Sequence, residues 1–224
     1  KQMITSGRIG KTAIVFAITK PGAGKKGLSA FIVPMNKPGF LISKTEEKMG
    51  QKASDCCQIN FDDVELDGSH LIGQEGDGYK IALQNLESGR IGIAAQSVGM
   101  AQAAYDYALQ YAKERITFGK PIFEHQAVGF RLAEMATNLE AARQLVLNAA
   151  HLKDQSVPCL KEACMAKLFA SEMAEKVCSD AIQTLGGYGY LSEYPVEKIA
   201  RDVRVCQLYE GTSDIQKIVI SRAL

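Results

Sequence analysis

The sequence changes character once, near residues 73–78, from strand-type to helix-type patterning. Before this glycine-rich segment, short runs of β-branched and aromatic residues are separated by Pro and Gly, which is typical of strands joined by turns. After it, alanine is frequent and apolar residues recur at intervals of three and four, which is typical of amphipathic helices. The sequence therefore predicts an α+β fold with two domains, residues 1–72 and 73–224.

The elements of each part follow from these patterns. Strands are predicted at residues 12–19, 28–33, 40–43 and 57–64, and their spacing indicates an antiparallel sheet or part of a barrel. Long helices are predicted at residues 79–115, 122–154 and 158–185, with shorter ones at 195–204 and 213–224. The third long helix carries a stripe of mostly small residues at Ala163, Ala166, Ala170, Met173, Val177 and Ala181. Such a stripe lets helices approach closely. Three long antiparallel helices and a terminal one predict a four-helix bundle.

Composition excludes several classes of function. A net charge of +1 favours neither nucleic acid nor a membrane surface as partner, and no apolar run approaches the length of a membrane span. The three His and six Cys residues lack metal-ligand spacing, and we interpret the cysteines as reduced, buried side chains. The first residues do not resemble a signal peptide. We expect a soluble protein of the bacterial cytoplasm or mitochondrial matrix, not a secreted one.

Residues 209–216, Tyr-Glu-Gly-Thr-Ser-Asp-Ile-Gln, place Glu210 beside a glycine where a helix begins. One interpretation is structural, because a carboxylate near a helix N-terminus interacts favourably with the helix dipole. The other is chemical, because a glycine leaves space for a substrate and a Glu in a dry site acts as a general base. The residues alone leave both open.

Five separated segments resemble the flavin-dependent acyl-CoA dehydrogenases, most of all the short-chain and short-branched-chain members. They are residues 1–7, 86–90, 115–126, 183–190 and 209–216. The resemblance covers essentially the whole chain and implies the C-terminal part of a middle β-domain followed by a C-terminal helical domain. It also implies a longer enzyme, whose N-terminal helical domain precedes this chain. Met3 departs from the pattern, because many members carry Trp there.

The resemblance implies α,β-desaturation of a short-chain, straight or branched, acyl-CoA to the trans-2-enoyl-CoA. Glu210 is then the base for the α-proton, with FAD as hydride acceptor through its N5 atom and the Glu210 backbone N–H as donor to the thioester carbonyl. Gly89 stands where some relatives carry their catalytic Glu, which leaves Glu210 as the base candidate.

Binding residues are implied by the same resemblance. For substrate they are Glu87, Ser88, Gly89, Arg90, Tyr209 and Gly211. For FAD they are Met3, Ile4, Thr5, Arg115, Phe118, Gln126, Gln183, Thr184, Leu185, Gly186, Gly187, Thr212, Ser213 and Asp214. Without the resemblance, Arg115 is a cation at a helix end and the glycine pair is a helix terminator.

The resemblance further implies a homotetramer that passes electrons to an electron-transferring flavoprotein. Two alternatives stay open at this point. One is a non-catalytic fragment that only oligomerises, and the other is an acyl-CoA oxidase-like enzyme in which oxygen takes the electrons.

Overall fold

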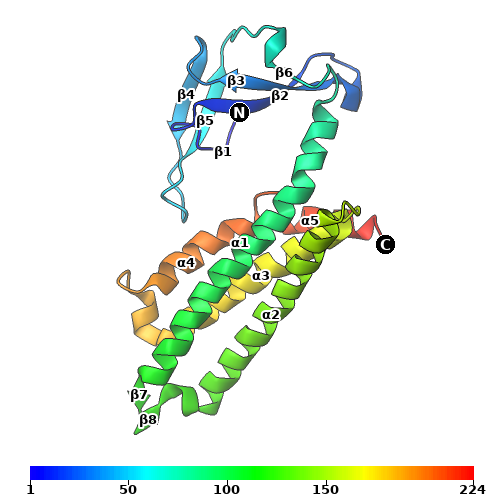
Figure 1. Cartoon of the computed structure of the whole chain (residues 1–224). Coiled ribbons are helices and arrows are strands. Elements are labelled where there is room, and N and C mark those ends of the chain that lie inside the picture. The colour runs from blue at the N-terminus through cyan, green and yellow to red at the C-terminus, as the bar shows by residue number, and fades with distance from the viewer. The chain divides into compact units, whose positions relative to one another are not determined.

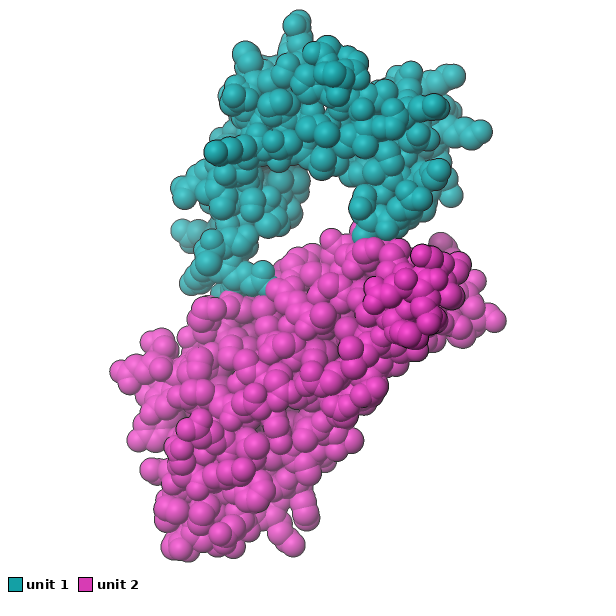
Figure 2. Space-filling view, viewed as in Figure 1, with its two compact units in different colours: residues 1–85 teal, residues 86–224 magenta.

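The computed structural model describes residues 1–224, which form two compact units, residues 1–85 and 86–224 (Figure 2). The first unit holds small antiparallel sheets and the second is helical, so the predicted α+β class is confirmed. The division falls inside α1 (Gly78–Glu114), later in the chain than the predicted boundary between residues 72 and 73.

The strands of the first unit form two three-stranded antiparallel sheets. Their strand orders are β1-β5-β4 and β2-β3-β6. The strands are β1 (Ile4–Thr5), β2 (Thr12–Ile18), β3 (Leu28–Pro34), β4 (Phe40–Thr45), β5 (Cys56–Phe61) and β6 (Leu71–Ile72). All four strands predicted by periodicity are present. The prediction that the last of these strands extends to residue 64 was wrong. β5 ends at Phe61, and Asp63 has a left-handed backbone with φ +47°, which a strand does not allow. Two-residue strands such as β6 carry no periodic signal.

The second unit contains the rest of α1 and four further helices (Figure 1). They are α2 (Gln126–Asp154), α3 (Leu160–Leu185), α4 (Pro195–Val203) and α5 (Ser213–Ser221), with the hairpin of β7 (Ile116–Thr117) and β8 (Lys120–Pro121) after α1. The predicted start of α2 at residue 122 was wrong, because residues 122–124 form a 3-10 turn and His125 is extended. In Figure 1, α1, α2 and α3 run alongside one another in alternating directions.

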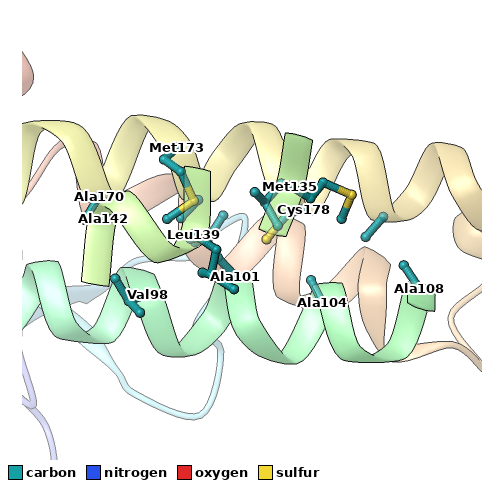
Figure 3. Packing of buried hydrophobic residues seen from close by; sticks show 14 of the residues in the cluster. Val98, Ala101, Ala104, Ala108, Met135, Leu139, Ala142, Ala170, Met173 and Cys178 are labelled. Carbon is teal, nitrogen blue, oxygen red and sulfur yellow. The ribbon is translucent and has the colours of Figure 1, made fainter. Parts of the chain in front are cut away.

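Small side chains allow these helices to pack closely (Figure 3). The predicted stripe on α3 is buried at every position, and it faces a core that includes Leu139 of α2 and Ala104 of α1. Helix α3 also carries a charged side chain, Lys167, that is fully buried. None of the helices combines the length and apolarity that a membrane span requires.

Ala142→Leu is expected to destabilise the helical unit. Ala142 is fully buried on α2, in the core cluster that α2 shares with α3, and three extra carbons there force side chains off their rotamers. The expected cost is about 1–3 kcal/mol in the free energy of unfolding, measured by urea denaturation. Its neighbour Ala141 is exposed on the same helix, so Ala141→Leu is the matched control with little expected change. Equal effects of the two variants would contradict this packing.

Candidate active site and cofactor site

Glu210 lies in a strained turn just before α5. Its backbone φ is +54° and that of Gly211 is +85°, so two consecutive residues are left-handed. Glycine adopts this conformation freely, whereas for other residues it costs about 1–2 kcal/mol. Thr212 then caps α5, its side-chain oxygen accepting from the Ile215 N–H at 3.4 Å. The local sequence thus forms a turn followed by a helix start, as expected.

Buried side chains hold the carbonyl groups of this turn. Gln216, fully buried on α5, donates through Nε2 to the carbonyl oxygen of Glu210 at 3.1 Å and to that of Gly211 at 2.9 Å. Lys167 on α3 donates through Nζ to the same Gly211 oxygen at 2.8 Å. Three hydrogen bonds therefore converge on two successive carbonyls.

The Glu210 carboxylate is directed at Gly89 on α1. A Cβ built on Gly89 would lie 2.5 Å from Oε2 of Glu210, well inside any real contact distance. Any side chain at position 89 would therefore have to displace the carboxylate. The structure brings the predicted base and the predicted glycine together, although they stand 121 residues apart in the sequence.

Two buried cations accompany this carboxylate. Arg90 is 5% exposed and its Nε has no hydrogen-bond partner, while Lys167 is fully buried. Burial lowers the pKa of Lys167, the charge of Arg90 lowers it further, and the charge of Glu210 acts in the opposite direction. The neighbouring Tyr209 donates its hydroxyl to Oε1 of Gln96 at 2.6 Å, which ties the turn to α1.

Glu87 faces a different part of the bundle. Its carboxylate pairs with Lys153 of α2 at 2.8 Å and accepts a weaker contact from the Cys159 thiol at 3.7 Å. Residues two apart on a helix point in different directions, so Glu87 and Gly89 do not share a face. Ser88 is exposed.

A second predicted group converges on a cavity of about 540 Å³ at the other end of α1. Arg115, Gln183, Thr184, Leu185, Gly186 and Gly187 all line it, together with Tyr111, Thr117, Ile122, Tyr188 and Leu191. The guanidinium of Arg115 lies 6.0 Å from the ring centre of Tyr188. Cβ atoms built on Gly186 and Gly187 would meet nothing within 4 Å, so the backbone there is open to a ligand.

Other predicted FAD residues lie outside this cavity. Phe118, with φ +51°, sits at the turn of the β7–β8 hairpin and is 96% exposed, and Gln126 is the exposed first residue of α2. Thr212, Ser213 and Asp214 open α5 beside the Glu210 turn. Met3, Ile4 and Thr5 belong to the first unit, where β1 pairs with β5 and Met3 is 71% exposed.

Sequence reasoning missed three polar residues of the site, Lys167, Gln216 and Gln96. A signal was present for the first, because Lys167 follows Ala163 by four residues and precedes Ala170 by three, on the stripe predicted to be buried. Tyr188 was also missed as a cavity residue.

Family models match both parts of the chain. The model described as acyl-CoA dehydrogenase, middle domain, matches residues 1–64, and that described as acyl-CoA dehydrogenase, C-terminal domain, matches residues 76–224. The human mitochondrial short-chain specific acyl-CoA dehydrogenase is 47% identical over 99% of this chain and 54% of its own length.

Solved structures agree with these matches. Butyryl-CoA dehydrogenase from Megasphaera elsdenii superposes with a TM-score of 0.97 at 43% identity, covering all of this chain and 58% of that one. A chain in the structure of the electron transferring flavoprotein of Acidaminococcus fermentans gives a TM-score of 0.97 at 46% identity, covering all of this chain and 59% of that one. This chain thus spans little more than half the length of these relatives.

Proposed function

Because this chain belongs to the acyl-CoA dehydrogenase family, we propose that it supplies the catalytic base and part of the flavin site of an enzyme that desaturates a short-chain acyl-CoA. The names of its relatives support this chain length, since one is a short-chain specific acyl-CoA dehydrogenase and another is a butyryl-CoA dehydrogenase. The product is the corresponding trans-2-enoyl-CoA.

The observation that carries the proposal is the pairing of Glu210 with Gly89. A general base must be within reach of the proton that it removes, and the absence of a side chain at position 89 makes room for the Glu210 carboxylate itself. Glu210 takes the α-proton of the acyl thioester. Its backbone N–H is the donor that we assign to the thioester carbonyl oxygen, where negative charge develops. Tyr209, Gly211, Arg90, Ser88 and Glu87 remain the proposed substrate-side residues.

The cavity lined by Arg115 fits part of FAD. A guanidinium suits the pyrophosphate, the open backbone at Gly186 and Gly187 allows close approach, and the amide of Gln183 can hydrogen-bond to polar edges of a nucleotide. Phe118, Gln126, Thr184, Leu185, Thr212, Ser213, Asp214, Met3, Ile4 and Thr5 complete the proposed FAD residues. When bound, FAD supplies the acceptor for the β-hydrogen, which leaves as hydride. A homotetramer and an electron-transferring flavoprotein as acceptor belong to the same proposal.

An absorption spectrum tests the proposal. The purified chain with added FAD is expected to retain flavin bands after gel filtration, and these are expected to bleach when butyryl-CoA is added without oxygen. A chain that keeps no flavin would reduce the proposal to the non-catalytic fragment. Oxygen consumption that outpaces dye reduction would instead favour the oxidase-like alternative.

Arg115→Gln is expected to weaken FAD binding by about 10- to 100-fold, because a hydrogen bond to a charged group contributes about 1.5–3 kcal/mol. Arg115 lines the cavity, and Gln removes the charge while keeping a polar side chain. Flavin fluorescence titration gives the dissociation constant. Lys113→Gln is the matched control, since Lys113 is an exposed cation of the last turn of α1 outside the cavity. If both variants bind FAD equally well, Arg115 does not contact the dinucleotide.

A further inference from the structure

Lys167 is the largest fully buried side chain of the protein, and nothing in the proposed chemistry uses it. A buried ammonium is costly unless it is hydrogen-bonded, because water no longer solvates the charge. A buried charge is weak evidence for a gain in stability, since replacing buried ion pairs with apolar side chains is often neutral or stabilising. The ammonium at this position therefore needs an explanation other than the stability of the fold.

The hydrogen bond that the Lys167 ammonium makes supplies that explanation. Nζ of Lys167 donates to the carbonyl oxygen of Gly211 at 2.8 Å, the residue directly after Glu210. That carbonyl oxygen also accepts from Nε2 of Gln216 at 2.9 Å, so both lone pairs are occupied. The Gly211 carbonyl belongs to the peptide that follows the left-handed pair Glu210 and Gly211, and the left-handed φ of +54° is unfavourable for Glu210. The two donors therefore hold the end of a turn that contains a strained residue.

The conformation of this turn sets the direction of the Glu210 side chain. The side chain of Glu210 leaves the turn toward Gly89, where only a missing Cβ makes room for its carboxylate. A small rotation of the turn would move the carboxylate away from that space. Around the ammonium lie Arg90 from α1, Cys164 on α3 itself, Cys206 from the 3-10 turn after α4, and Glu210.

We propose that Lys167 is a positioning residue, which locks the Glu210–Gly211 turn through the Gly211 carbonyl and so holds the Glu210 carboxylate at the reacting carbon. This inference rests on the proposed function. A positioning role of Lys167 can be distinguished from a structural role by measurement. A structural lysine would affect the whole bundle, whereas a positioning lysine affects the turn and the chemical step.

Lys167→Met tests the inference with two readouts. Amide hydrogen exchange in residues 209–216 is expected to become about 10-fold faster or more, because a charge-assisted hydrogen bond is lost. Exchange along α3 is expected to stay unchanged, and the unfolding temperature is expected to hold or rise. In the flavin-loaded chain, the bleaching rate at saturating butyryl-CoA is expected to fall about 100-fold, with little change in the KM.

Lys176→Met is the matched control, because Lys176 lies on α3 but is 61% exposed. Lys167→Gln keeps a donor of shorter reach without the charge, and is expected to give intermediate exchange and bleaching. If Lys167→Met does not fold, exchange and bleaching of Lys167→Gln test the positioning role instead. Unchanged exchange in residues 209–216, or an equal increase along α3, would overturn the positioning role. If the wild-type chain shows no acyl-CoA bleaching, the proposed function fails, while the exchange comparison still decides what Lys167 does.

Discussion

Glu210→Gln is expected to slow substrate-dependent flavin bleaching by about 10²- to 10⁴-fold, because a positioned general base contributes that factor. Gln has nearly the same size and keeps the hydrogen bonds that the backbone of the turn makes with Gln216. Fold and bound FAD are therefore expected to be unchanged in circular dichroism and in the visible spectrum. Stopped-flow absorbance with butyryl-CoA under anaerobic conditions measures the rate.

Glu172→Gln provides the comparison for this variant. Glu172 lies on α3 with 48% of its side chain exposed, at 3.9 Å from Lys217, and it belongs to no proposed site. Its bleaching rate is expected to equal that of the wild type. If Glu210→Gln also bleached at the wild-type rate, the α-proton would have another base and the assignment would be wrong.

Gly89→Ala is expected to keep or raise the stability of the fold and to lower the rate of flavin bleaching. The new methyl group would lie 2.5 Å from Oε2 of Glu210, and the end of this flexible side chain can move, so the fold is expected to survive. Removing a glycine from the interior of α1 is expected to stabilise the helix by about 0.5–1 kcal/mol. The displaced carboxylate is expected to cost about 100-fold in the bleaching rate.

Gly92→Ala is the matched control for this change. Gly92 lies on α1, and a Cβ built there would meet nothing within 4 Å. The same helix stabilisation is therefore expected without any loss of activity. A Gly89→Ala variant that is as active as Gly92→Ala would show that the Glu210 carboxylate does not work from its position against Gly89.

Local patterns predicted the elements well because their causes are local. The apolar stripe of α3 follows from helical periodicity, and its six predicted positions are all buried. The start of α2 was misplaced because Ile122 is apolar and buried but belongs to a 3-10 turn, which the stripe alone cannot distinguish from a first helical turn. The strand order of the two sheets could not be predicted, because periodicity does not indicate which distant strands pair.

The sequence by itself determined the α+β class, the helices and the identity of Glu210 and Gly89 as candidates, because these depend on spacing, turn chemistry and family resemblance. Only the tertiary structure placed Glu210 against Gly89 and buried Lys167 on the Gly211 carbonyl. It also gathered Arg115 with the glycine pair around one cavity. These contacts join residues from 44 to 121 positions apart, and such contacts depend on how the helices pack rather than on any local preference of the chain.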